Sequence, residues 1–516
     1  MSTGWQRPSG GEGRLGKYLE TGRLPSIGEV LVKTAGWAVP RNYDRLLVRV
    51  KRERQPKLDA EAGFALPDLG GKPLSSRTFT STYFDAADRR LLRAGITLRR
   101  RVENRAGVWQ LKLPADDGRF ELEVRGGPGK PPSAFVDLLA ASLRAGTVVE
   151  PVARMRTRRE GVSVGTSVDR VEVVVDTVTV VGTRSGFVEI EAEVVAGDGS
   201  ALPGIGQALR KAGASPARHT SKLARVLGEA GRPAEGDGDP VAKVRDGVVA
   251  QYEAILASDP GVRLGEDPEA LHQLRVATRR SRAILRAARG LIAADWTEPL
   301  RAELKWLGGL LGPVRDLDVL LEHLDSAAAS LEEEDARAYR RLRARLVAAR
   351  HGARQTLLEG LRSERYFQLV DTLAGGADAP AGDLPTPLPE IACNAYGRLR
   401  KVVRALPGRP ADEELHRVRI EVKRARYAAE LASPDLGKRG ARLIERAKVV
   451  QDLIGDHQDA VVAEQRLREL ALRGGGKTGL VAGRLIERQR RRKRKARHAF
   501  PGAMRQLEKA ARGAFR

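Results

Sequence analysis

A basic helical segment that occurs twice constrains the fold of this chain more than any other feature. The first copy, HQLRVATRRSRAILR, carries a histidine and four arginines spaced alternately by three and four residues: His272, Arg275, Arg279, Arg282 and Arg286. At 3.6 residues per turn, this spacing places all five on one stripe of a helix. The opposite stripe is largely apolar, so the segment predicts an amphipathic helix with one cationic face.

The second copy, HRVRIEVKRARY, repeats the first four offsets with a histidine and three cations: His416, Arg419, Lys423 and Arg426. The two leading histidines lie 144 residues apart (416 − 272). The downstream segments LLGPVRDLD and LIGDHQDAV contain glycine and aspartate landmarks that lie 143 residues apart (455 − 312 and 459 − 316). Nearly equal offsets indicate an internal duplication. A single basic helix face is usually only a solvated surface, but its repetition in both halves favours an anion-binding role.

The net charge of the chain points to a polyanionic partner. It is +25, with a sequence pI near 10.5, which suits nucleic acid, anionic lipid or inorganic phosphate chains. Part of the arginine content reflects a chain rich in Ala, Gly and Arg throughout. Aromatic residues make up only 4%, which argues against base stacking on single-stranded RNA or DNA. Charge-driven nucleic-acid binding remains an alternative that is not favoured, because neither half contains a recognised nucleic-acid motif.

Other features of the composition exclude several classes of protein. The single cysteine, Cys393, excludes an internal disulfide framework and a multi-thiolate zinc site. The sequence has no run of eighteen apolar residues, and no signal-peptide pattern opens it. We therefore expect a soluble, cytoplasmic protein without a membrane partner. The sequence does not indicate its oligomeric state.

The chain predicts an α+β protein of two domains. Residues 43–227 contain short alternating runs such as TLRRRVEN, RFELEVRG and FVEIEAEV, which predict an antiparallel β-barrel. The Gly-rich residues 1–42 are predicted to be a flexible tail, and the Gly-, Pro- and acid-rich residues 228–239 a linker. Residues 240–516 are predicted to be all-α, with duplicated halves at about 240–374 and 390–516.

Charged side chains alternate with apolar ones along several of the predicted strands. Arg99 and Arg101 share one face of a strand, and so do Glu189 and Glu191. A barrel with outer helices and a polar lumen would satisfy both faces. Carboxylates bind hard divalent cations, while Arg and Lys bind phosphate oxygens. The pattern therefore indicates a phosphate-plus-metal site inside the barrel.

The helical region resembles a CHAD domain, the "conserved histidine α-helical domain", over roughly residues 240–510. The similarity lies in HQLRVATRRSRAILR, LLGPVRDLDVL, HRVRIEVKRARYAAEL and DLIGDHQDA. It implies two four-helix bundles around a basic channel that binds inorganic polyphosphate, with possible association with polyphosphate granules. The polyphosphate-binding residues it implies are His272, Arg275, Arg279, Arg280, Arg282, Arg315, His416, Arg419, Lys423, Arg424, Arg426 and His457.

The β-rich region resembles a CYTH domain, the triphosphate tunnel fold of class IV adenylate cyclases, thiamine triphosphatases and inorganic triphosphatases. The similarity lies in STYFDAADRRLLRAGITLRRR, GVWQLKLP, RFELEV, FVEIEAEV and TSKLARVL. It implies a hydrolase that uses Mg²⁺ or Mn²⁺. The implied tunnel cations are Arg99, Arg101, Lys112, Arg156, Arg158 and Lys222. The implied catalytic residues are Glu53, Lys57, Glu121 and Glu123, and the implied metal ligands are Glu53, Asp176, Glu189 and Glu191.

The first-strand motif departs from the family pattern Glu-x-Glu-x-Lys. The matching stretch is Glu53-Arg54-Gln55-Pro56-Lys57, in which Gln55 removes one anionic metal ligand and Pro56 removes a backbone donor. Binding of a phosphate chain survives such changes more easily than hydrolysis does. The sequence thus leaves two alternatives open: a metal-dependent triphosphatase, or a non-catalytic polyphosphate-binding or targeting protein with a degenerate tunnel. Nothing in it specifies an adenine pocket.

Overall fold

The computed structural model describes residues 47–51, 57–115, 118–144, 147–228, 239–265, 267–329, 331–384, 386–472 and 476–516. The chain divides into two compact units, Met1–Ala230 and Gly231–Arg516. The predicted tail lies outside the described residues, as do most of the predicted linker and the first-strand residues Glu53, Gln55 and Pro56.

The described part of the first unit contains one antiparallel ten-stranded sheet, in the order β1-β6-β5-β4-β3-β7-β8-β9-β2-β10. Its strands are β1 (Leu47–Lys51), β2 (Leu58–Ala60), β3 (Lys72–Asp85), β4 (Thr97–Glu103), β5 (Ala106–Ala115), β6 (Gly118–Arg125), β7 (Glu150–Gly165), β8 (Arg170–Val180), β9 (Gly186–Ala196) and β10 (Ser215–Pro216). The two-residue turn between β4 and β5 has positive φ at Asn104 and Arg105, as tight hairpins require. This turn sets the register that places Arg99 opposite Gln110.

The sheet is strongly curved but is not a closed barrel. Strands β1 and β10 form its two edges, and no ladder among the described residues joins them. The prediction of an antiparallel sheet is confirmed, whereas "barrel" describes it only loosely. Strands β1 and β2 pair near opposite edges although they are consecutive in the chain. The connection between them includes residues 52–56, which are not among the described ones.

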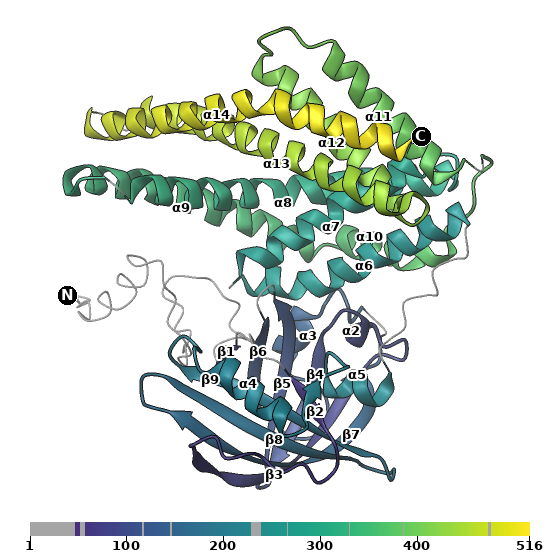
Figure 1. Ribbon diagram of the computed structural model, residues 1–516, viewed down its shortest axis with the longest axis vertical. Helices are drawn as coiled ribbons and strands as arrows, with labels where there is room; N and C mark the ends of the chain where they lie inside the picture. Colours follow the sequence, from purple (N-terminus) through teal and green to yellow (C-terminus); the bar gives the residue numbers. More distant parts are fainter. Residues whose placement is uncertain are drawn as a thin grey trace, which may run out of the picture. The chain divides into compact units, whose positions relative to one another are not determined.

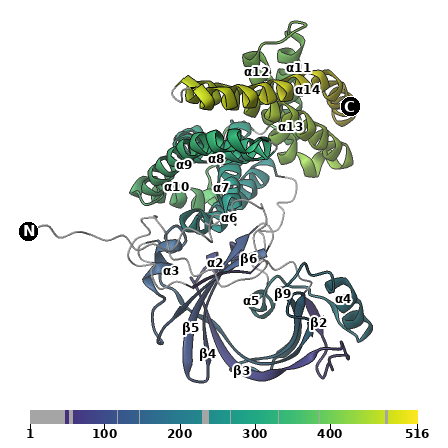
Figure 2. The ribbon, with the colours of Figure 1, turned by 90° about the vertical axis from the view of Figure 1, so that its left-hand side faces the viewer.

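The two faces of the sheet differ as the alternating pattern predicts. On one face, Val173 and Ile190 pack against Ile205 and Leu209 of α4. The alternate residues of β9, among them Glu189 and Glu191, point to the concave side. Figure 2 shows α5 lying within the curve of the sheet and α4 lying outside it. The helices in the described part of this unit are α2 (Arg90–Arg93), α3 (Ser133–Leu138), α4 (Leu202–Lys211) and α5 (Lys222–Leu227).

The second unit is helical throughout its described residues, apart from isolated bridges. Its helices are α6 (Pro240–Leu264), α7 (Pro268–Ala287), α8 (Ala294–Ala328), α9 (Glu333–Leu361), α10 (Glu364–Ala374), the 3₁₀ helix η2 (Gly375–Asp378), α11 (Leu388–Arg404), α12 (Asp412–Leu431), α13 (Ser433–Leu472) and α14 (Gly476–Ala514). Both ends of α12 lie 144 residues after those of α7 (412 − 268 and 431 − 287). The duplication therefore extends to whole helices.

The cores of this unit follow the duplication. Buried residues of α11, α12, α13 and α14 form the four-helix core of the second half. In the first half, α6 packs on α7, α7 on α8 and α8 on α9, while α10 contacts α6, α8 and α9. The outer ends of the long helices α8, α9, α13 and α14 share a further core (Figure 1), which ties the two halves together.

Local signals fix where the first cationic stripe begins. Asp267 caps α7 by accepting a hydrogen bond from the Glu269 backbone N–H at 2.9 Å, and Pro268 occupies the first turn.

Among the described helices of the chain, none is long and apolar enough to span a membrane.

Candidate functional site

The two cationic stripes meet where α7 and α12 pack together in the second unit. Four half-buried side chains form a group that we call the central cationic cluster: Arg275, Arg279, Arg419 and Lys423. The Arg279 Nε atom donates a hydrogen bond to Tyr427 Oη across the two helices at 2.8 Å. The structure therefore brings together residues that lie about 144 positions apart in the chain.

Electrostatic crowding within the cluster is strong. Burial, and then the charges of the three neighbouring arginines, lowers the pKa of Lys423 to about 7. Burial also lowers the pKa of Arg419, against the opposing charge of Asp459. Binding of an anion to these crowded, partly desolvated cations is favourable, because the anion neutralises their mutual repulsion. Shifted pKa values of this kind are typical of functional sites.

Two aspartates that the sequence marked as landmarks supply the partial counter-charge. Asp316 Oδ1 lies 2.7 Å from Arg275 Nη1. In the second half, Asp459 is close enough to Arg419 to affect its pKa, while burial raises the pKa of Asp459 itself. Two carboxylates thus neutralise only part of the positive charge of the four cations in the cluster.

The leading histidines lie at the edge of the cluster with different neighbours. Burial, and then the charge of Arg315, lowers the pKa of His272. The His416 Nδ1 atom lies 3.1 Å from Gln458 Oε1. Position 458 corresponds to Arg315 of the first half, so the two halves differ at this point. His272 and Arg315, predicted together as binding residues, do lie close together.

The other predicted residues of the second unit have their own partners or lie exposed. Arg280 and Arg426 both pair with Glu430, at 3.9 and 3.5 Å. Arg424 pairs with Glu421, and Arg282 is exposed. His457 is buried beside Asp412, away from the α7 stripe. The central cationic cluster therefore contains fewer residues than the predicted polyphosphate-binding set.

In the first unit, Lys222 at the start of α5 is enclosed by three carboxylates on β8 and β9. Its Nζ atom lies 3.1 Å from Asp176, 2.5 Å from Glu189 and 3.0 Å from Glu191. Arg159 on β7 joins the group, at 2.6 Å from Asp176 and 3.0 Å from Glu191. Lys57 lies 3.9 Å from Glu191. We call these six residues the tunnel network.

The charges in the tunnel network stabilise one another despite their burial. Burial alone would lower the pKa of Lys222, but the carboxylates, Glu191 first, raise it well above its usual value. Burial would raise the pKa of Glu191, yet Lys222 and then Arg159 hold it well below its usual value. Burial raises the pKa of Glu189. The Glu189–Glu191 pair therefore shares its protons unequally, with Glu191 the more firmly ionised.

A second group of polar side chains lies on β4, β5 and β6. Lys112 Nζ lies 3.5 Å from Glu121, and Gln110 donates to Glu121 at 3.2 Å and to Glu123 at 2.5 Å. The Arg99 Nε atom donates to Gln110 Oε1 at 2.7 Å. These predicted tunnel residues are therefore brought together.

Only some of the arginines on β4 and β7 lie on the concave face of the sheet. Arg101 lies over the Phe79 ring at 5.3 Å, and burial, then Arg99, lowers its pKa. Arg156 and Arg158 are exposed and are not brought into the tunnel network. Arg159, which the sequence did not single out, is the β7 cation that enters it. A shift of one residue in strand register moves a side chain to the other face.

Among the described residues, a lysine occupies the space between the carboxylates of the predicted metal set. Lys222 lies between Asp176, Glu189 and Glu191, where a cation would otherwise be held. Within the described ranges, no group of three or more His, Cys, Asp or Glu side chains could hold a metal. Glu53, the fourth predicted ligand, lies outside the described residues. The predicted metal set therefore stays a prediction.

Comparison with known proteins agrees with this architecture of a charged, curved sheet followed by a duplicated helical domain. A family model of the CYTH domain matches residues 48–225, and one of the CHAD domain matches residues 248–468. The chain belongs to the CYTH–CHAD two-domain family. The CYTH domain places it among triphosphatase-like tunnel proteins, which generally depend on divalent metals, and both domains fit a role connected with triphosphate or polyphosphate.

Relatives cover most of the chain. A protein of Mycobacterium tuberculosis (strain CDC 1551 / Oshkosh), described as uncharacterized, is 34% identical over an alignment of 480 residues, and the match covers 84% of this chain and 90% of that protein. Among solved structures, PptA from Streptomyces chartreusis is 28% identical and covers 51% of this chain and 99% of its own, with a TM-score of 0.44. The CHAD domain from the plant Ricinus communis is 24% identical and covers 53% and 93%, with a TM-score of 0.45.

Proposed function

We propose that this protein binds inorganic polyphosphate along the central cationic cluster. The observation that carries the proposal is the convergence of Arg275 and Arg279 of α7 with Arg419 and Lys423 of α12, which lowers the pKa of Lys423 to about 7. Because the cations recur at each turn of two packed helices, a linear polyanion can contact several of them at once. Each contact replaces repulsion between cations by attraction to a phosphate oxygen.

The binding test compares long-chain polyphosphate with duplex DNA on the purified full chain at several salt concentrations. We expect tighter binding of polyphosphate, because its phosphates are closely spaced and carry no bulky bases or sugars. Equal affinities with the same steep salt dependence would show that net charge alone drives binding, and would favour the nucleic-acid alternative. Absence of polyphosphate binding at low salt would refute the proposal.

The affinity for polyphosphate is expected to fall about tenfold between pH 6 and pH 8, because Lys423 must be protonated to bind a phosphate. The charged groups around it are Arg419 on the same helix, Arg275 and Arg279 on α7, and Asp459 on α13. A bound polyanion raises the pKa of Lys423, so binding takes up a proton above pH 7. Titration calorimetry with long chains, whose interior phosphates do not titrate in this range, measures the effect.

The control for this pH dependence is Lys423→Arg, whose guanidinium stays charged throughout. We expect its affinity to change much less than tenfold over the same range. If the native chain and this variant lose affinity in parallel as the pH rises, Lys423 is not the titrating group.

We further propose that the concave face of the CYTH sheet binds a triphosphate-like anion. Arg99 and Arg101 support this, because neither makes a close ion pair with a carboxylate among those described, and both lie on one face of β4. Hydrolysis remains an alternative that the resemblance implies. It is tested by incubating the full chain with tripolyphosphate and Mn²⁺ and measuring phosphate release.

Restoring the first-strand motif separates a hydrolase from a binder. We expect Gln55→Glu combined with Pro56→Val to raise phosphate release by about tenfold or more, because it returns a missing carboxylate to the family motif. Gln55→Asn with Pro56→Val restores the backbone donor without the charge and serves as the control. Equal release from the native chain and both variants would show that the departure from the motif does not limit activity.

A further inference from the structure

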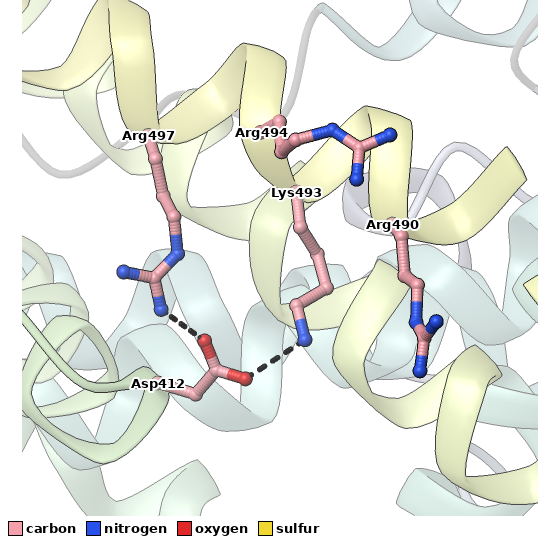
Figure 3. Close-up of a pocket in the computed structure, with 5 residues that line it drawn as sticks. All are labelled: Asp412, Arg490, Lys493, Arg494 and Arg497. Carbon is pink, nitrogen blue, oxygen red and sulfur yellow. Dashed lines mark hydrogen bonds and ion pairs between the residues drawn. The ribbon is translucent and has the colours of Figure 1, made fainter. Parts of the chain in front are cut away.

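A second concentration of positive charge lies at the start of α12, on α14. There, a pocket of about 430 Å³ is lined by one carboxylate and four cations: Asp412, Arg490, Lys493, Arg494 and Arg497. Figure 3 shows the Arg497 and Lys493 side chains converging on Asp412. The sequence of 484–498, with nine Lys or Arg in fifteen residues, favours a solvated basic helix, with a nucleic-acid arm as a less favoured alternative. The structure instead shows a hollowed site with charge directed into it.

The cations of this α14 pocket exceed its own counter-charges. Asp412 accepts from both Lys493, at 3.0 Å, and Arg497. Glu464 pairs with Lys493 at 3.2 Å and with Arg490 at 3.1 Å. Arg494 pairs with Glu487 at 2.7 Å, and Glu464 also pairs with Arg468 outside the pocket. Three carboxylates therefore serve the four pocket cations, and the one that lines the pocket, Asp412, is held in place by Lys493 and Arg497. An anion of higher charge could compete with Asp412 for them.

A buried histidine lies next to the pocket. The His457 residue is 1% exposed, and its Nε2 atom lies 3.2 Å from Asp412 Oδ1. Its Nδ1 atom has no hydrogen-bond partner in the described part of the chain. A buried polar group without a partner carries a cost that structures usually avoid. His457 is therefore a further potential donor on the same side as Asp412.

Two residues of the α14 site, Asp412 and His457, are not repeated in the first half of the duplication. At the offset of 144, Asp412 corresponds to Pro268, and at 143, His457 corresponds to Val314. The pocket nevertheless continues the second cationic stripe, because Asp412 precedes His416 by four residues and shares its face of α12. Its four cations lie beyond residues 248–468, where the CHAD model matches.

We propose that the α14 pocket is a second phosphate-binding site, at one end of the second cationic stripe, in which Asp412 acts as a built-in competitor for the bound anion. Its ligand is a phosphate group, either free inorganic phosphate or pyrophosphate, or the terminal phosphates of a chain lying along the stripe. The chain-end source rests on the proposed polyphosphate binding; the free-anion source does not. Because the first half has Pro268 and Val314 at the positions of Asp412 and His457, the two halves of the duplicated surface differ at this site.

The test measures pyrophosphate binding to the full chain by titration calorimetry. Arg490→Gln with Arg494→Gln is expected to weaken it about three- to tenfold, because both cations are partly exposed and each makes a screened contact. Asp412→Asn is expected to strengthen it by a similar factor, since the competing charge is removed. The matched control is Arg491→Gln, on the same helix and outside the pocket, with a side chain 73% exposed; its effect should be less than twofold.

These opposite signs make the inference separable from the proposed function. Unchanged pyrophosphate binding in both pocket variants overturns the second site, whatever long chains do. Failure of long polyphosphate to bind the native chain overturns the proposed function, while the pyrophosphate results still decide the pocket. Long chains with esterified ends distinguish the two sources. If the pocket variants change the affinity for unmodified long chains but not for esterified ones, the pocket binds chain ends. If they change only the binding of pyrophosphate or orthophosphate, the pocket binds the free anion.

Discussion

Replacing Arg279, Arg419 and Lys423 together by glutamine is expected to weaken long-chain polyphosphate binding by about a thousandfold. Hydrogen bonds to charged groups contribute roughly 1.5–3 kcal/mol each, and solvent screening of half-buried side chains reduces that figure. A combined loss of about 4 kcal/mol corresponds to three orders of magnitude in Kd. Titration of the full-length protein with long-chain polyphosphate at one fixed salt concentration measures the change.

The same substitution should not destabilise the helical domain. Lys423 has a pKa of about 7 in the folded chain against an ordinary value of 10.5, so the unfolded state binds more protons between these values. The contribution of Lys423 to the free energy of unfolding therefore rises with pH from about 7 to 10.5, and its charged form is unfavourable below that range. Removing crowded cations relieves this repulsion. Lost binding combined with unchanged or raised stability is the signature of a binding surface.

The matched control removes three exposed arginines of the same domain: Arg289, Arg337 and Arg417. It changes the net charge by the same amount, so a binding mode that depends only on net charge predicts equal losses from the two triple variants. A specific site predicts a loss for the control of less than about tenfold. If both variants lose affinity equally, the central cationic cluster is not the polyphosphate site.

The helical half of the fold could be predicted closely because its signals are local. The three- and four-residue spacing from His272 onward sets the stripe on α7, and the 144-residue offset carries the prediction to α12. Which cations converge was less predictable, because it depends on how α7 packs against α12. Arg282 belongs to the predicted stripe but is exposed, whereas Arg279 reaches Tyr427 of the other half. Such contacts between distant segments leave no local pattern.

The sheet was harder to predict in detail because strand faces depend on register. The alternation in β9 placed Glu189 and Glu191 on one face, and the structure brings both to Lys222. On β7 the resemblance singled out Arg156 and Arg158, whereas the neighbouring Arg159 enters the tunnel network. The period of two in a strand makes an error of one residue decisive.

The α14 pocket shows why a basic run could not be interpreted from composition. The arginines and lysines of 484–498 suggest a solvated helix when considered alone. Their common site depends on Asp412 and the adjoining His457, which lie far away in the sequence and approach only when α12, α13 and α14 pack together. A helical period predicts a face, but it does not predict what the face contacts.

Replacing Lys222 by methionine is expected to destabilise the CYTH domain by about 3–5 kcal/mol at pH 7, because removal of one partner leaves buried charges uncompensated. The Lys222 side chain is 11% exposed, and it contacts Asp176, Glu189 and Glu191 within 3.1 Å. Arg159 would remain within 3.0 Å of Asp176 and Glu191, and Lys57 would remain 3.9 Å from Glu191. Hydrogen exchange of the β8 and β9 amides measures the loss locally, in a chain with two folding units.

The loss of stability caused by Lys222→Met should become smaller as the pH falls. Such a pH dependence would show that the loss is due to uncompensated charge. In the native chain, Lys222 and Arg159 hold the pKa of Glu191 below its usual value of 4.5, so its stabilising contribution is present above that value and is lost as the pH falls through the lowered pKa. In Lys222→Met, the pKa values of Glu189 and Glu191 rise, because a neighbouring positive charge is lost, and protonation at lower pH removes the unpaired charge. Lys222→Arg keeps the charge, and Lys130→Met, at an exposed position, controls for loss of a lysine. A penalty equal at pH 5 and pH 8 would assign the effect to packing, and the tunnel network would then not depend on this lysine's charge.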